Sequence, residues 1–232
     1  MDSRVAYRLD DSIATITMDD GKMNVLSLPM FAALSAALDR AEADRAVVIL
    51  TGREGVFSAG FDLRVLGAGG AATRDLVRTG FELAERVLSF PAPVVVACTG
   101  HALAMGVFLL LSGDYRVGAA GAYRIGANEV AIGITMPFFG VEICRQRLAP
   151  AHFHRAVVNA EIYAPDDAVG AGFLDRVVPA AELQAFARTT AGRLAQLDFD
   201  VHAASKRRAR DHALRAIRAA IEADDAAFGA QA

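Results

Sequence analysis

The sequence predicts an α/β fold built on a largely parallel sheet, followed by a helical C-terminal part. Two fully apolar runs, residues 46–50 and 94–97, each follow a segment with helical periodicity, which is the order of right-handed crossover units. Beyond about residue 150 the pattern becomes helical and rich in alanine. Hydrophobic residues make up 54% and charged residues 22% of the 232 residues, so the chain can bury a large core.

The N-terminal elements come first. Residues 5–9 and 12–18 alternate apolar and polar side chains around Asp10 and Asp11, which predicts a β-hairpin. A helix is predicted to follow, with Ser27 as its cap and Pro29 in its first turn. The predicted buried face of this helix contains the apolar residues Phe31, Leu34, Ala37, Leu38 and Ala41.

The remaining elements follow the same logic. We expect a helix over residues 72–88 that ends before Pro91, a short strand over 115–117, and C-terminal helices over 165–171, 181–195 and 201–228. The low-complexity stretch 67–72 predicts a flexible surface loop. The change of pattern near residue 195 divides the chain into a core, residues 1–195, and a C-terminal helical appendix, residues 196–232.

Composition excludes several classes of protein. A net charge of −3 and a pI near 6.0 argue against a general nucleic-acid binder. Only two cysteines are present, Cys98 and Cys144, and both lie in apolar surroundings, as expected for reduced thiols of a cytoplasmic protein. The N-terminus has no apolar run that would indicate a signal peptide. The longest apolar stretch, residues 102–111, is too short to span a bilayer.

The first segment with chemical potential is Phe57-Ser-Ala-Gly-Phe-Asp-Leu63, which follows the apolar run at 46–50. Its small residues Ser58, Ala59 and Gly60 allow a ligand to approach the backbone closely. Asp62 can cap a helix or fix the loop. Taken alone, the segment is equally consistent with an ordinary glycine turn.

The second segment, Gly100-His-Ala-Leu-Ala-Met-Gly-Val107, follows the apolar run at 94–97 and leads into an apolar helix. A strand, a turn of small residues and a buried helix place backbone N–H groups where they can hold a developing oxyanion. His101 is a candidate base, but no carboxylate can be assigned to it, which favours a structural role.

The third segment runs from Ile125 to Pro137 and contains Asn128 and Glu129 in mostly apolar surroundings. An apolar pocket raises the pKa of a carboxyl group toward neutral pH, which suits a general acid or base. A glutamate that starts a helix and faces water is the alternative interpretation.

Together, in this order, the three segments resemble the crotonase superfamily of enoyl-CoA hydratases and isomerases over nearly the whole chain. Residues 57–63 are similar to the family's first oxyanion loop, and residues 100–106 to its second, Gly-x-Ala-x-Gly-Gly-Gly. Residues 21–26 match the Asn-containing loop that lines the CoA site, and residues 168–178 match a late Ala-x-x-x-Gly-Leu-Val-Asp segment. The resemblance implies a ClpP-like spiral of ββα units with a C-terminal helical appendix.

The resemblance also implies roles for individual residues. Phe61 and Met105 occupy the positions whose backbone N–H groups form the oxyanion hole, and Glu129 matches a catalytic glutamate. The bulk of Phe61 and Met105, where the family has small residues, is expected to reshape or narrow the acyl pocket. Substrate-binding positions correspond to Lys22, Asn24, Ala59, Gly60, Asp62, Gly106 and Phe108.

The choice of reaction depends on Phe108. It stands where the family's hydratases carry a second glutamate, so a single carboxylate remains. Moving a double bond requires one such group, and the sequence around Glu129 resembles that of Δ3,Δ2-enoyl-CoA isomerases. We therefore expect an enoyl-CoA isomerase. A hydratase with Glu129 acting alone, or an acyl-CoA-binding protein with weak or no catalysis, are the alternatives.

The expected partners follow from the same resemblance. The substrate is an acyl-CoA thioester, with no metal or redox cofactor and no nucleic-acid or membrane partner. Relatives form trimers or pairs of trimers, and the same is expected here. The basic run 206–210 can bind CoA phosphates or form a solvated helix face.

Overall fold

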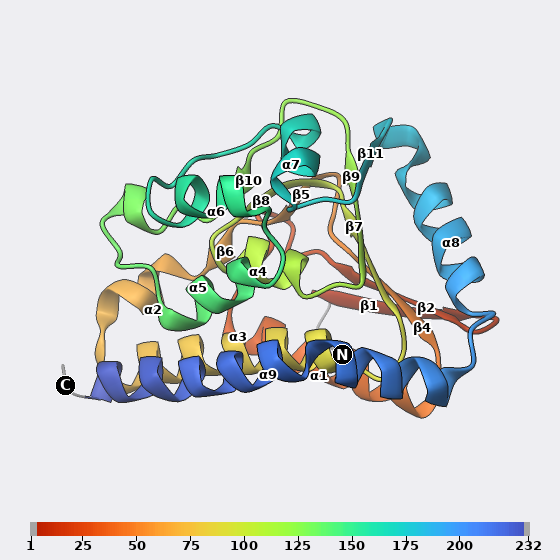
Figure 1. The fold of residues 1–232 in the computed structure, drawn as a ribbon, viewed down its shortest axis with the longest axis horizontal. Helices are drawn as coiled ribbons and strands as arrows, with labels where there is room; N and C mark the ends of the chain where they lie inside the picture. Colours follow the sequence, from red (N-terminus) through yellow and green to blue (C-terminus); the bar gives the residue numbers. More distant parts are fainter. Residues whose placement is uncertain (1–3, 230–232) are drawn as a thin grey trace.

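A six-stranded sheet organises the computed structural model, which describes residues 4–229 (Figure 1). Its strands lie in the order β1-β2-β4-β7-β9-β11. Strands β1 (Val5–Asp10) and β2 (Ile13–Met18) form the predicted antiparallel hairpin. The other pairs are all parallel and join β4 (Val47–Thr51), β7 (Val94–Cys98), β9 (Tyr115–Ala119) and β11 (Arg176–Val178). The predicted α/β class with a largely parallel sheet is confirmed.

Short strands follow three of the long ones and form a second parallel sheet. These strands are β5 (Gly55–Ser58), β8 (Gly100–Leu103) and β10 (Ile125–Gly126), in the order β10-β8-β5. A further parallel pair joins β3 (Val25–Leu26) to β6 (Gly60–Phe61). Strands β2, β4, β7 and β9 thus each lead through one or two short strands to a helical segment, which confirms the spiral of ββα units.

Helices cover both faces of the large sheet (Figure 1). Helix α8 (Leu183–Leu194) packs on one face, where its Leu183, Ala187 and Ala191 join a buried cluster of strand residues. The larger core lies on the other face, under the remaining helices. These are α1 (Leu28–Ala43), α2 (Leu63–Ala68), α3 (Gly70–Ser89), α4 (Met105–Leu111), α5 (Phe138–Arg145), α6 (Pro150–Val157), α7 (Pro165–Ala171) and α9 (Phe199–Gly229), with the 3-10 turn η1 (Val130–Ile132). A second 3-10 turn, η2 (Ala180–Glu182), directly precedes α8 and contacts it.

The stretch 67–72, predicted to be a flexible loop, is mostly helical. Helices α2 and α3 meet at Gly69, whose φ of +69° breaks the helical path. The Thr73 hydroxyl donates to the Val65 carbonyl, 2.6 Å away, and ties the two helices together. The prediction was wrong because low complexity indicates weak side-chain packing but does not reveal this local hydrogen bond.

The long helix α9 packs along α3 and α5 and confirms the predicted C-terminal helix. The predicted boundary at residue 195 falls between α8 and α9. Residues 1–3 and 230–232 of the two predicted segments lie outside the described residues, and the predicted role in oligomer contacts stays a prediction. Within residues 4–229 no helix has both the length and the apolar character needed to cross a membrane.

A buried carboxylate fixes α9 to the sheet. Asp114, directly before β9, accepts hydrogen bonds from the Val94 N–H at 2.7 Å and from Lys206 Nζ at 2.6 Å. Arg210 pairs with the other carboxylate oxygen at 2.8 Å. The Lys206 side chain is only 4% exposed. The hypothesis that the basic run 206–210 binds CoA is therefore wrong for Lys206 and Arg210, since both serve this internal contact.

We expect Asp114→Ala to lower the free energy of unfolding by about 3–5 kcal/mol, because it leaves the buried Lys206 charge without its partner. Urea unfolding followed by circular dichroism measures this change. Asp211→Ala is the matched control on α9, since Asp211 pairs with Arg215 at the surface; it should change stability by less than about 1 kcal/mol. If the two substitutions lowered stability equally, Asp114 would not be the carboxylate that compensates the buried Lys206 charge.

Candidate active site

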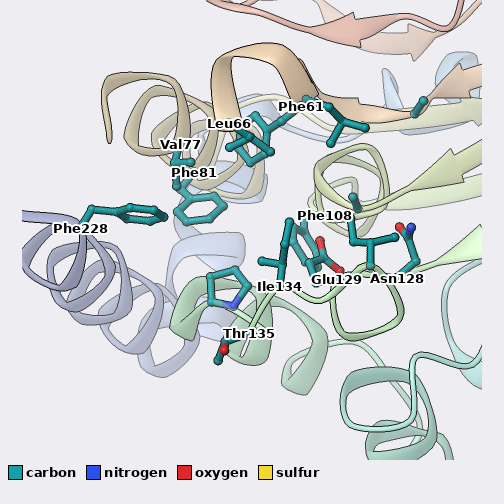
Figure 2. A pocket seen from close by; sticks show the side chains of 15 residues that line it. Phe61, Leu66, Val77, Phe81, Phe108, Asn128, Glu129, Ile134, Thr135 and Phe228 are labelled. Carbon is teal, nitrogen blue, oxygen red and sulfur yellow. The ribbon is translucent and has the colours of Figure 1, made fainter. Parts of the chain in front are cut away.

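A cavity of about 180 Å³ lies between α2, α3, α4, the segment around η1 and the end of α9 (Figure 2). Its wall is almost wholly apolar, and Glu129 is its single ionisable side chain among the described residues. The lining residues are Ala59, Phe61, Leu63, Leu66, Val77, Phe81, Ala104, Phe108, Asn128, Glu129, Ile132, Ile134, Thr135, Pro137 and Phe228.

Glu129 directly precedes η1 and is buried to all but 6% of its surface. Its Oε2 atom is buried and has no hydrogen-bond partner within the described part of the chain. Burial disfavours the charged form and raises the pKa of this carboxyl from 4.5 to about 7. The group therefore exchanges a proton near neutral pH, as a general acid or base must.

The first predicted loop joins β5 to β6, and hydrogen bonds to the segment before β3 and to β3 itself hold it in place. Ser58 Oγ donates to the Asn24 carbonyl at 2.8 Å and accepts from the Gly60 N–H at 3.1 Å. The Asp62 N–H donates to the Leu26 carbonyl of β3. Because consecutive residues of a strand direct their N–H groups to opposite sides, the Phe61 N–H points away from β3.

The second predicted loop joins β8 to α4. Ala104 has a φ of +49°, and Met105 is the first residue of the helix. A first helical residue has no carbonyl within its own helix to accept its N–H. Met105 is fully buried, its side chain belongs to the core, and it is not among the residues that line the cavity.

The two loops touch at positions that admit only glycine. A Cβ atom on Gly60 would lie 2.9 Å from the Ala104 Cβ and 3.2 Å from the Met105 nitrogen. A Cβ atom on Gly106 would lie 2.5 Å from the Ser58 carbonyl oxygen. The structure thus brings the Phe61 and Met105 segments into direct contact beside the cavity.

A second, more open cavity of about 780 Å³ adjoins the first, and the two share Ala59, Phe61 and Leu63. Lys22 and Asp62, both predicted to bind substrate, lie along it. Asp62 also caps α2 and pairs with Arg64 at 3.1 Å. The apolar cavity and this groove with charged walls therefore meet at the first loop.

Of the other residues predicted to bind substrate, some line the apolar cavity and others lie buried beside it. Ala59 and Phe108 line the apolar cavity, whereas Gly60 and Gly106 lie below the surface at the loop contact. The fully buried Asn24 side chain donates to the carbonyls of Met18 and Phe57, at 3.0 and 3.1 Å, so we expect it to shape the loop without touching a ligand.

Several residues that line the cavity have no role assigned from the sequence, and three of them bear on the chemistry or the shape of the site. Asn128 was recognised as polar but received no role, and its buried Oδ1 has no partner within residues 4–229. Thr135 and Phe228 also line the cavity. Phe228 lies about a hundred positions from Glu129 in the chain, and no local pattern signals its arrival there. His101 has the favoured structural role, since its Nδ1 accepts from the Arg124 N–H at 3.0 Å.

The ββα spiral, the contacting loops and the buried glutamate define a class of protein, and comparison with known families agrees. The model of the enoyl-CoA hydratase/isomerase family matches residues 8–231. The chain belongs to this family. It is 31% identical over 182 residues to mitochondrial enoyl-CoA delta isomerase 1 of Mus musculus, which covers 76% of this chain and 63% of the mouse protein. The chain thus spans less than two thirds of that relative's length.

Two solved structures that are equally similar in sequence to this chain are named after two different reactions. The enoyl-CoA hydratase EchA3 of Mycobacterium ulcerans is 47% identical, with a TM-score of 0.94 over 97% of this chain and 99% of that one. The enoyl-CoA isomerase of Mycobacterium tuberculosis is also 47% identical, with a TM-score of 0.93 over the same shares. Family membership therefore leaves the reaction to be argued from the site.

We expect Glu129→Gln to stabilise the protein at pH 8 and not at pH 4.5. The folded state keeps the carboxyl proton up to about pH 7, whereas the unfolded chain releases it near pH 4.5. The wild type therefore loses stability as the pH rises through this window, and the variant does not. The difference in unfolding free energy should grow by roughly 2–3 kcal/mol between pH 4.5 and 8.

Urea unfolding at several pH values measures this difference. Glu54→Gln controls for the loss of a negative charge, since Glu54 is exposed. The difference in unfolding free energy between this variant and wild type should not grow between pH 4.5 and 8. A pH-independent gain in Glu129→Gln would show that the carboxyl is not buried as described.

Proposed function

We propose that this protein is a Δ3,Δ2-enoyl-CoA isomerase in which Glu129 is the only acid/base group. The observation that supports this most strongly is the composition of the apolar cavity, where Glu129 is the single ionisable side chain among the described lining residues. Phe108, at the position of the hydratases' other glutamate, contributes only a buried ring to the same wall. One carboxylate suffices to remove a proton from one carbon and return it to another.

The proposed reaction has two proton transfers. The Glu129 carboxylate takes a proton from C2 of a 3-enoyl thioester, and the electron pair moves to the thioester oxygen to give a dienolate. The protonated Glu129 then donates to C4, the double bond forms between C2 and C3, and the carboxylate is regenerated. A pKa of about 7 allows both steps near neutral pH, and such transfers contribute about 10²–10⁴-fold to the rate.

The dienolate oxygen needs stabilisation between the two steps. We assign this to the backbone N–H groups of Phe61 and Met105, because their segments are in contact and neither N–H is directed at its own strand or helix partner. Each donor in such a site is worth about 3–4 kcal/mol of transition-state stabilisation. This chemistry uses no metal or redox cofactor.

The adjoining open cavity is proposed to hold the CoA part of the substrate. It shares the lining residues Ala59, Phe61 and Leu63 with the apolar cavity, as a thioester that joins an acyl chain to CoA requires. Lys22 and Arg64 line it and supply positive charge for phosphate groups. Asp62 fixes Arg64 by a two-pronged contact, with Nε at 3.3 Å and Nη2 at 3.1 Å.

Hydration is the second candidate function, and Asn128 is the observation that favours it. Its buried Oδ1 lines the cavity beside Glu129 and has no partner in the described chain. An acceptor in this position can hold a water molecule for attack on a 2-enoyl thioester.

The two reactions are separated by parallel assays with a 3-enoyl-CoA and a 2-enoyl-CoA. We expect conversion of the 3-enoyl thioester to the 2-enoyl product and no hydration of the 2-enoyl thioester. Glu129→Gln should lower kcat by at least about 10²-fold, because no other carboxylate among residues 4–229 lines the cavity. Hydration that disappears in this variant would favour the second candidate. Binding of acyl-CoA without either conversion would indicate a binding protein.

The oxyanion assignment is tested by Met105→Pro, which removes the N–H while proline remains acceptable in the first turn of a helix. We expect kcat to fall by about 10²–10³-fold. Met105→Leu is the matched variant, because it keeps the N–H and changes only the side chain, and it should lose far less. If Met105→Pro retained full kcat, the Met105 N–H would not be a donor.

A further inference from the structure

The end of the apolar cavity away from Asn128 is formed by two aromatic rings from different parts of the chain. Figure 2 shows Phe81 of α3 and Phe228 of α9 next to each other at this end, with Glu129 nearer Asn128. Phe81 is 1% exposed and stacks on Phe139, with ring centroids 4.2 Å apart, so it belongs to the core. Phe228 is half-buried and packs against the edge of the core from α9.

The crevice behind these rings is closed. It lies between α3 and α9, is lined by Val77, Phe81, Ile221 and Phe228 together with the charged residues described next, and has no room for a water molecule. A ligand chain that grows along the apolar cavity therefore meets the Phe228 ring and finds no space beyond it.

Two carboxylates of α9, one turn before Phe228, fix Phe228 in this position. Asp224 accepts from the N–H groups of Phe138 and Phe139 at the start of α5, at 2.9 and 2.8 Å. Asp225 pairs with Arg74 and Arg78 of α3, at 2.6 and 2.9 Å. Residues four and three positions apart share one face of a helix, so these contacts hold the Phe228 ring over the cavity.

The charges make this anchoring persistent at ordinary pH. The hydrogen bond from Arg74, with the further charge of Arg78, lowers the pKa of Asp225 to about 2. Asp224 lies in the opening of α5, where two free N–H groups need an acceptor. The last described turns of α9 are thus fastened to both helices that border the end of the cavity.

We propose that Phe228 sets the length of acyl chain that the site accepts. This inference rests on the proposed function and deepens it. The cavity of about 180 Å³ is small beside the roughly 300–1,000 Å³ of common ligand pockets, and the fixed Phe228 ring forms part of its far wall. The enzyme takes short acyl chains, and the ring excludes longer ones.

The test measures dissociation constants of hexanoyl-, decanoyl- and tetradecanoyl-CoA for the full chain by isothermal titration calorimetry. These saturated thioesters cannot isomerise, so binding is read independently of catalysis. Wild type should bind hexanoyl-CoA and gain nothing from longer chains. Phe228→Ala should bind decanoyl-CoA roughly tenfold more tightly than wild type, because the added methylenes enter new apolar space, with hexanoyl-CoA changed by less than about twofold.

Phe228→Leu provides a conservative second variant and should give an intermediate gain. Phe199→Ala is the matched control, since Phe199 is a partly buried phenylalanine at the other end of α9, and it should leave the chain-length profile as in wild type. A gain of equal size at every length, or the same profile in Phe228→Ala and Phe199→Ala, overturns the inference and leaves the proposed function standing. Wild type that binds none of the three thioesters overturns both.

Discussion

The site depends on one steric constraint, the close approach of two backbones. The loop that ends β5 and the turn that starts α4 touch at Gly60 and Gly106, where a Cβ atom would collide with the opposite segment. Both loops follow long parallel strands, so the sheet fixes where they arrive. In the proposed function, this contact brings the backbone amides of Phe61 and Met105 together at the edge of the apolar cavity. Larger side chains at Phe61 and Met105 are compatible with it, because only their backbone takes part.

A buried carboxyl is the second constraint. Glu129 lies in a wall that leaves its Oε2 atom without a hydrogen-bond partner among the described residues, and the protein tolerates this cost where a fully paired or exposed glutamate would be more stable. Burial of the carboxyl raises its pKa and keeps the proton exchangeable near neutral pH. The Oδ1 atom of Asn128 is also buried without a partner in the described chain. These two polar atoms therefore lie at one end of the cavity, opposite the aromatic end.

Much of this arrangement could be predicted from the sequence, because it is encoded locally. Apolar runs marked the strands, Ser27 and Pro29 marked a helix start, and small residues marked the loops at Gly60 and Gly106. The remainder is non-local. The burial of Asn24, the use of Lys206 in an internal ion pair and the position of Phe228 depend on segments that meet only in the folded chain. Residue type alone does not distinguish a solvated lysine from a buried one.

The ion pairs of α9 also bear on how the molecule folds. Arg74 and Asp225 are 151 positions apart, and Asp114 and Lys206 are 92 positions apart. Contacts between such distant segments form slowly, because the loop-closure entropy is lost before any contact compensates for it. A chain with a formed sheet and an undocked α9 exposes the apolar faces of α3 and α5. Docking of the last helix therefore covers these apolar faces as well as completing the wall of the cavity.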